Sequence, residues 1–321
     1  MTFSLCLGVF TSVASIANEQ GLALERKISL GKVSGRIDHM AIDLARKRLF
    51  VNELGNNSVA IVDLQSGQVI RQIDGMREPQ GIGYSSETGV AAVASAGDGS
   101  VRLFKGDDLT PAGTIELGDD ADNIRSDEAG RLVVGYGSGG LATLDVARGK
   151  KTGDIVLPGH PEGFQIDPKR SRIYVNLPSA HQIGVVDSPS GKIVASWGLW
   201  LAVGNFPMAL DGEGGRIFSG YRWPASVVAI STATGKVSNN VKTCGDGDDL
   251  FYDGARKRLY MSCGDGHVAV FDAASGLTET SRISTREGAR TSIFVPELDR
   301  LIVAIPMSGN RLAEIWVYAP K

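Results

Sequence analysis

The chain has few of the residues that build several common catalytic and metal sites. Its 321 residues include only three cysteines and four histidines, and it contains no H-E-x-x-H, G-x-S-x-G, Walker loop or paired C-x-x-C. The formal net charge of −3 gives no general attraction to nucleic acid or to anionic membranes. These absences disfavour zinc peptidases, α/β-hydrolases and P-loop enzymes, and we expect no nucleic-acid partner.

Long helix-forming stretches rich in Lys, Glu and Ala are also missing. Glycine, by contrast, is abundant at 41 residues, and aromatic residues make up only 7% of the chain. This balance favours many short strands joined by tight turns. A chain of this length can bury a substantial core.

The one extended apolar stretch lies at the N-terminus. It runs uncharged through Val13, which is short of the roughly 20 residues that a membrane span needs. Ser15 and Ala17 fit the small-x-small pattern of a signal peptidase site. We expect residues 1–17 to be a cleaved export signal, with a buried strand as the alternative. Since the usual basic residues before the apolar core are missing, we expect the natural start to lie upstream.

Two segments far apart in the chain have nearly the same sequence, which we call the repeated phrase. LARKRLFVNELGNNSVAIVDLQSG occupies 44–67, and GARKRLYMSCGDGHVAVFDAASG occupies 254–276. In each, an Asp just before the segment (Asp43, Asp253) belongs to a turn that leads to an Arg and an apolar run, and a second turn of the D-x-x-[ST]-G kind follows. Apolar runs of four to six residues between turn signals are typical of strands.

Weaker copies of this phrase recur along the chain at intervals of 40 to 44 residues. The repeats begin near Asp38, Gln80, Asp122, Glu162, Phe206, Asp248 and Thr291. A period of roughly 40–50 residues with four strands is that of a β-propeller blade. The sequence therefore predicts an all-β, seven-bladed β-propeller.

The seventh repeat supplies only three strands, ending at EIWVYAP. The segment LALERKISLGK at 22–32 resembles the strands that close other blades, so we expect it to complete the last blade. This pairing would close the ring and remove an open sheet edge. One domain over 22–319 follows, and we expect a monomer.

The phrases RLFVNE and RIYVNL, each followed by an apolar run and D-x-x-[ST]-G, resemble the YVTN-type repeat of YncE-like seven-bladed propellers. The similarity covers about residues 22–319, and EPQGIGY, GDDADNIR and NFPMALD resemble one bacterial subgroup of that family. The resemblance implies a propeller fold and export, hence a periplasmic or secreted protein. It implies no single activity and no catalytic residues.

The repeat places one residue of each blade where the innermost strand begins, around the central channel. Four of these seven positions are acidic. The candidate ligand-binding residues of this face are Asp38, His39, Gln80, Asp122, Asn123, Glu162, Phe206, Trp223, Asp248, Asp249 and Arg290. Clustered carboxylates raise one another's pKa unless a cation or arginine neutralises them. Arg36, Arg77 and Arg290 lie in the same loops and could do so.

Asp122, Glu162 and Asp248 are the candidate metal ligands. Oxygen ligands suit Ca²⁺, Mg²⁺ or Mn²⁺, whereas a single neighbouring histidine argues against an all-nitrogen zinc site. The alternative is that each Asp caps backbone amides at its own turn.

An aromatic group occupies the same face near the fifth blade. Phe206, Tyr221, Trp223 and Trp200 could hold an organic cation beside the carboxylates, or could be packing residues.

Cys244 and Cys263 are the cysteines left after removal of the predicted signal. Both fall on the same face of the sixth blade, so we predict a disulfide between them, with two buried thiols as the alternative. The bridge would brace Asp248 and Asp249. His267 on the next strand is interpreted as a surface histidine.

Three functions remain open. The first is an exported binding protein with an acidic central funnel for a small or cationic ligand. The second is a metal-dependent hydrolase or lyase, resembling a lactonase, in which His39 or Glu162 moves the proton. The third is a disc that docks a protein partner on its acidic face.

Overall fold

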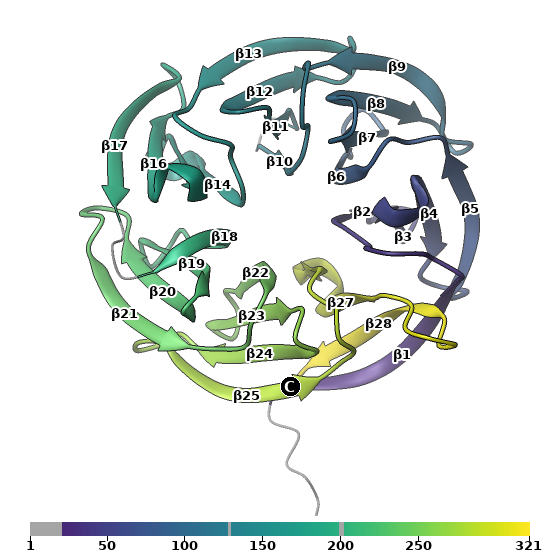
Figure 1. Ribbon diagram of the computed structural model, residues 1–321. Helices are drawn as coiled ribbons and strands as arrows, with labels where there is room; N and C mark the ends of the chain where they lie inside the picture. The colour runs from purple at the N-terminus through teal and green to yellow at the C-terminus, as the bar shows by residue number, and fades with distance from the viewer. Residues whose placement is uncertain (1–20, 128–129, 199–201) are drawn as a thin grey trace, which may run out of the picture.

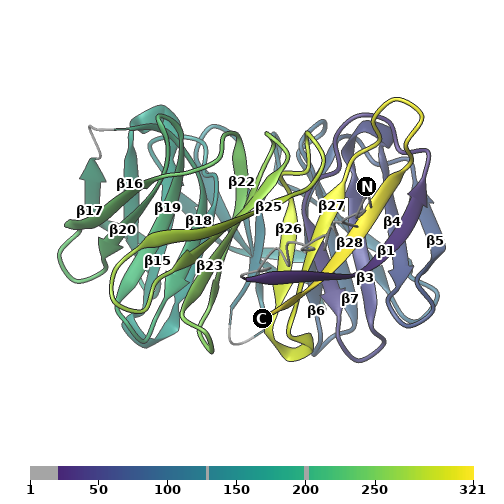
Figure 2. The ribbon, with the colours of Figure 1, turned by 90° about the horizontal axis from the view of Figure 1, so that it is seen from below.

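The computed structural model describes residues 21–127, 130–198 and 202–321. These residues form seven antiparallel sheets of four strands each, arranged as blades around one axis (Figure 1). Seen from the edge, the molecule is a disc whose sheets stand across its thickness (Figure 2). The seven-bladed β-propeller predicted from the repeat is confirmed. The predicted signal at 1–17 and Trp200 lie outside the described residues.

The strands follow one another from the channel outward in each blade. Blades one to three hold β2 (Met40–Asp43), β3 (Arg48–Glu53), β4 (Ser58–Asp63), β5 (Gln68–Asp74), β6 (Pro79–Ser85), β7 (Val90–Ser95), β8 (Ser100–Lys105), β9 (Thr110–Glu116), β10 (Ile124–Ser126), β11 (Leu132–Tyr136), β12 (Gly140–Asp145) and β13 (Lys150–Val156). Blades four to six hold β14 (Phe164–Asp167), β15 (Arg172–Leu177), β16 (Gln182–Asp187), β17 (Lys192–Gly198), β18 (Val203–Asp211), β19 (Arg216–Trp223), β20 (Ala225–Ser231), β21 (Val237–Lys242), β22 (Gly247–Asp253), β23 (Arg258–Cys263), β24 (His267–Asp272) and β25 (Thr278–Ser284). Blade seven holds β26 (Ser292–Val295), β27 (Arg300–Ile305), β28 (Ala313–Pro320) and β1 (Leu22–Gly31).

Short 3₁₀ turns occupy Leu54–Asn56, Pro168–Arg170, Pro178–Ala180 and Pro296–Leu298. Within the described residues, no helix has the length and apolar character that a membrane crossing requires.

The repeated Asp and Arg of each phrase form the turn between the first two strands of a blade. Asp43 pairs in register with Arg48, and its carboxylate accepts a hydrogen bond from the backbone N–H of Arg46 at 3.2 Å. Asp253 is placed in the same way before Arg258. The Asp thus satisfies the turn's own amide, which is the usual reason for an Asp at this position. The repeated phrase therefore specifies the hairpins.

The hydrophobic core lies between the blades. The middle strands β3 and β4 are buried almost throughout, whereas the outer strand β5 is almost wholly exposed. Leu49 and Val51 of blade one share a buried cluster with Ile302 and Ile315 of blade seven. Each blade therefore buries its faces only against its two neighbours, and the core requires a complete ring.

The N-terminal strand β1 completes the last blade, as predicted. It pairs antiparallel with β28 from Leu22 opposite Pro320 to Gly31 opposite Ala313. The two strands, purple and yellow, lie side by side at the edge of the ring (Figure 1). Arg26 extends the closure to blade one, because its guanidinium donates to the carbonyl oxygens of Leu64 and Ser66, each at 2.8 Å.

Loss of packing in β1 should weaken the whole ring. Ile28 is 1% exposed and lies in the cluster shared by blades seven and one. We expect Ile28→Ala to lower the free energy of unfolding by about 2–5 kcal/mol, measured by urea denaturation. Leu24→Ala, on the 42% exposed side chain of the same strand, is the control and should change it by less than about 1 kcal/mol. Equal effects of the two substitutions would contradict this account of closure.

Candidate functional site

The start of each innermost strand is held in place by the neighbouring blade. Asn52, at the end of the RLFVNE phrase, is fully buried and donates a side-chain hydrogen bond of 2.7 Å to the backbone oxygen of Gln80. Asn176, in RIYVNL, donates equivalently to the backbone oxygen of Phe206 at 3.0 Å. The repeated asparagine therefore fixes the ring residue of the next blade.

Glycine permits this close approach of the inner strands. A β-carbon on Gly81 would lie 1.9 Å from the backbone oxygen of Asp122, and one on Gly163 would lie 2.5 Å from that of Phe206. Neither position can carry a side chain without separating the strands. The narrow channel mouth thus follows from the sequence of the inner strands.

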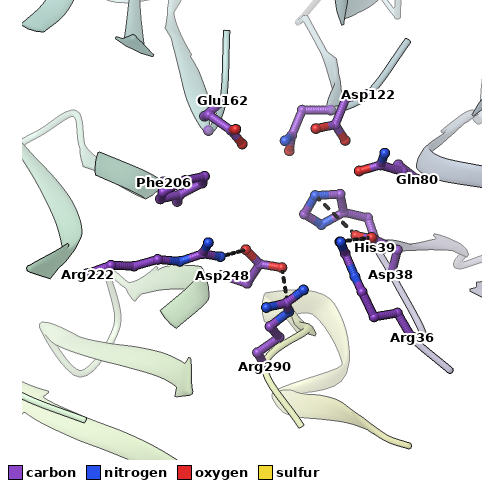
Figure 3. Close-up of a pocket in the computed structure, with 12 residues that line it drawn as sticks. Arg36, Asp38, His39, Gln80, Asp122, Glu162, Phe206, Arg222, Asp248 and Arg290 are labelled. Atoms are coloured by element: carbon purple, nitrogen blue, oxygen red, sulfur yellow. Dashed lines mark hydrogen bonds and ion pairs between the residues drawn. The ribbon is translucent and has the colours of Figure 1, made fainter. Parts of the chain in front are cut away.

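Six of the seven predicted ring positions line one cavity at the channel mouth, which we call the mouth cavity. Its volume is about 120 Å³. The lining residues are Arg36, Asp38, His39, Gln80, Asp122, Asn123, Glu162, Gly163, Phe206, Arg222, Asp248 and Arg290. The cavity is too small for a drug-sized ligand but has room for a small polar group and water. Figure 3 shows the labelled side chains converging on this space.

Three of the predicted residues lie elsewhere. Thr291, the seventh ring position, is buried and donates through Oγ1 to the backbone oxygen of Ile37 at 3.1 Å. Trp223 is 65% exposed and does not line the mouth cavity. Asp249 lies deeper in the channel, where its Oδ1 is 3.5 Å from Nδ1 of His39.

One side of the mouth cavity consists of acids already paired with arginines, so the cavity is less acidic than a ring of carboxylates alone. Arg36 lies 2.5 Å from Asp38. Asp248 lies 2.9 Å from Arg222 and 3.3 Å from Arg290. We call these five residues the arginine side, and Figure 3 shows them below the cavity centre. Burial raises the pKa of Asp248, but Arg290 opposes that shift.

The opposite side carries acceptors that no described arginine pairs with, although Oδ2 of Asp122 lies 3.9 Å from Nε2 of His160. We call Gln80, Asp122, Asn123 and Glu162 the acceptor arc. Oδ1 of Asp122 and Oδ1 of Asn123 are buried and have no hydrogen-bond partner among the described residues. The Glu162 carboxylate likewise makes no hydrogen bond or ion pair with a described residue. Buried acceptors of this kind cost free energy unless a donor or cation reaches them.

The pKa values of the ionisable groups around the mouth cavity also depend on which groups have a charged partner. Burial, together with repulsion from Asp122, raises the pKa of Glu162 to about 8. Burial would lower the pKa of His160, but Asp122 and the backbone oxygen of Gly137 raise it to about 9. Burial opposes charge on His39 as well, yet Asp249 and Asp38 raise its pKa to about 10. Glu162 therefore carries a negative charge only above about pH 8, where a cation in the cavity would compensate it.

Arg222 and His160 were not singled out from the sequence. Arg222 comes from the second strand of blade five and stacks on the ring of Phe206, with 3.8 Å from the guanidinium carbon to the ring centroid. This contact covers the aromatic face predicted for an organic cation. Tyr221 is buried, and Trp223 is exposed outside the cavity. The described residues therefore form no aromatic cage at the mouth.

The predicted metal ligands are not gathered as a ready-made set. The one described group of three His, Cys, Asp or Glu side chains with ligand atoms within 4.8 Å of one another is Cys244, Cys263 and Asp265. Both of its sulfurs are in a disulfide, so it offers no thiolate ligands. Asp122, Glu162 and Asp248 line one cavity but do not converge in this way, and the metal site stays a prediction.

The predicted disulfide between Cys244 and Cys263 is confirmed, with Cα atoms 5.9 Å apart. It joins the loop before β22 to the end of β23. Asp246, in the loop it encloses, accepts hydrogen bonds from Arg290 at 2.8 and 3.0 Å. The bridge therefore supports the arginine side of the mouth cavity. His267 lies 3.1 Å from Asp265 and away from the cavity, as a surface histidine would.

The comparisons with known proteins show the fold and no family. A chain of Kuenenia stuttgartiensis hydrazine synthase superposes with a TM-score of 0.77 at 18% identity, covering 90% of this chain and 95% of that one. A chain in a crystal structure of the mitotic checkpoint complex gives 0.76 at 14% identity, with 98% of each chain covered. No protein-family model matches, and no curated protein is significantly similar in sequence.

Reduction of the disulfide should loosen the arginine side. The bridge joins residues 19 apart in sequence, and closing a loop of that length contributes about 3 kcal/mol. We expect the double variant Cys244→Ala, Cys263→Ala to lose about that free energy of unfolding in urea denaturation. The wild type in reductant should match the variant, and a wild type equally stable with and without reductant would contradict the prediction.

Proposed function

We propose that the protein is a binding protein whose channel mouth receives a small positively charged group. The observation that carries this proposal is the acceptor arc, with buried oxygens on Asp122 and Asn123 that lack a partner beside the unpaired carboxylate of Glu162. Acceptors that converge from two blades match a group with several N–H donors, such as a primary ammonium.

The arginine side supports this choice of ligand. Because Asp38 and Asp248 are already paired with arginines, they are poor partners for an incoming cation. The acceptor arc therefore sets the position of the charge. The stacking of Arg222 on Phe206 disfavours a quaternary ammonium, which has no N–H donor and binds mainly through aromatic faces.

We further propose that the protein works outside the cytoplasm, in the periplasm or after secretion. Two observations support this. The disulfide between Cys244 and Cys263 is typical of an oxidising compartment. The N-terminal sequence has the pattern of an export signal.

Calorimetric titration at about pH 9, above the pKa of Glu162, tests the proposal. We expect methylammonium to bind and tetramethylammonium to bind much more weakly. Glu162→Gln and Asp122→Asn should each weaken methylammonium binding by about tenfold or more, because each removes a charged acceptor. Asp119→Asn is the matched control, since it removes one exposed charge from the neighbouring loop, and it should leave binding unchanged.

The other outcomes separate the rival functions. Binding of Ca²⁺, Mg²⁺ or Mn²⁺ that is lost in Glu162→Gln, without methylammonium binding, would replace this proposal by a metal site, which the metal-dependent enzyme requires. If the protein binds none of these ions, the remaining function is the disc that docks a protein partner. Equal losses in Asp119→Asn and Glu162→Gln would show that general charge, and not the acceptor arc, attracts the cation.

A further inference from the structure

A second cavity lies deeper in the same channel, beyond the contact between His39 and Asp249. We call it the inner cavity. His39 lines both cavities, and Asp249 lines only the inner one. The inner cavity has a volume of about 280 Å³, near the lower end of the range for small-molecule sites.

The walls of the inner cavity combine apolar and polar side chains, whereas those of the mouth are almost wholly polar. The innermost strands of five blades contribute Met40, Ile42, Ile82, Ile124, Phe251 and Ile293. Ile42, Phe251 and Ile293 are only partly buried, so part of their apolar surface faces the cavity. A ligand with an apolar body would remove this surface from water.

One unpaired cation lies among these walls. Arg125, on β10, lines the inner cavity, and no carboxylate of the described residues lies within ion-pair distance of it. Its guanidinium donates a 2.9 Å hydrogen bond from Nη1 to the backbone oxygen of Ile124 and lies 5.9 Å from the ring centroid of Phe164. Burial lowers the pKa of this guanidinium, although Asp249 and Asp122 oppose the shift. Arg125 is only partly buried, so its remaining N–H donors are open to water or to an acceptor on a ligand in the cavity.

The nearest acid does not neutralise Arg125 directly. Asp249 lies 3.5 Å from the imidazole of His39 and accepts a hydrogen bond of 2.8 Å from the backbone N–H of Ser292. Because the charges of His39 and Asp249 offset one another, the residues that line the inner cavity have one net positive charge, which is that of Arg125. A monoanion would complement it.

We propose that the inner cavity binds a small monocarboxylate with a compact apolar body, held by Arg125 through its carboxylate and by the surrounding aliphatic and aromatic side chains through its body. An arginine guanidinium matches a carboxylate with two parallel hydrogen bonds. This site goes beyond the proposed cation site and does not depend on it, because the charged groups that would hold the two ligands are different and opposite in sign.

Calorimetric titration of the full-length protein with benzoate tests the proposal. We expect benzoate to bind the wild type and Arg125→Met to bind it about tenfold or more weakly, with Arg125→Lys in between. Benzamide, of the same shape but uncharged, and acetate, charged but without the apolar body, should both bind more weakly than benzoate. Glu162→Gln should bind benzoate as the wild type does, which separates this site from the mouth.

A second variant keeps the test informative if the Arg125 variants fail to fold. Ile42→Trp fills the cavity from a different blade, and we expect it to abolish benzoate binding while the protein keeps its circular dichroism spectrum. Equal binding of benzoate and benzamide, or benzoate binding unaffected by Arg125→Met and Ile42→Trp, would overturn the proposal. So would chloride or acetate binding as tightly as benzoate, because the site would then hold an adventitious ion only.

Discussion

Closure of the ring by β1 and β28 is the constraint on which the other features depend. A propeller blade has two faces to bury, and here each buried cluster is shared by neighbouring blades, as Leu49 and Ile302 share one across the closure. An open ring would expose two such faces and one strand edge. The channel exists only because the closed ring brings seven innermost strands to one axis, so both cavities depend on this pairing.

Different charged groups lie at different depths along the axis of the channel. At the mouth, arginines satisfy Asp38 and Asp248, whereas on the facing side Glu162 has no arginine partner among the described residues and Asp122 has only His160, at 3.9 Å from its Oδ2. Deeper in, His39 and Asp249 offset one another, and Arg125 keeps its charge among apolar side chains. In a region poor in water, each uncompensated charge selects a ligand of the opposite sign. The two ends of one channel therefore favour different chemical groups.

Much of this arrangement can be predicted from the sequence because the repeat fixes both turn and register. The Asp that caps the first hairpin recurs at the same place in the phrase, so the sequence alone is enough to align the ring residues, and the Asn that reaches the next blade recurs in blades one and four. Six of the seven line one cavity. Thr291 does not, since its hydroxyl is used in a hydrogen bond to Ile37.

The features of the site that could not be predicted from the sequence involve long side chains that extend from one blade toward another. Arg222 belongs to a second strand, outside the aligned positions, yet its length lets it cover Phe206 and pair with Asp248. Arg125 follows an aligned position by three residues and faces the deeper part of the channel. Long side chains of this kind change the charge of a cavity without leaving a periodic signal. The repeat therefore predicts which loops meet, and the structure is needed to show which acids remain unpaired.

The most direct test of the account is the position of a cation in the channel. Rubidium is close to ammonium in size and is located by anomalous diffraction, so crystals soaked in rubidium chloride at about pH 9 and about pH 6 can be compared. The account predicts an anomalous peak in contact with Glu162 and Asp122 at the higher pH. The peak should weaken at the lower pH, because Glu162 is protonated below its pKa of about 8 and His160 is charged below about 9. Ordered water at the acceptor arc at both pH values, with rubidium elsewhere or absent, would contradict it.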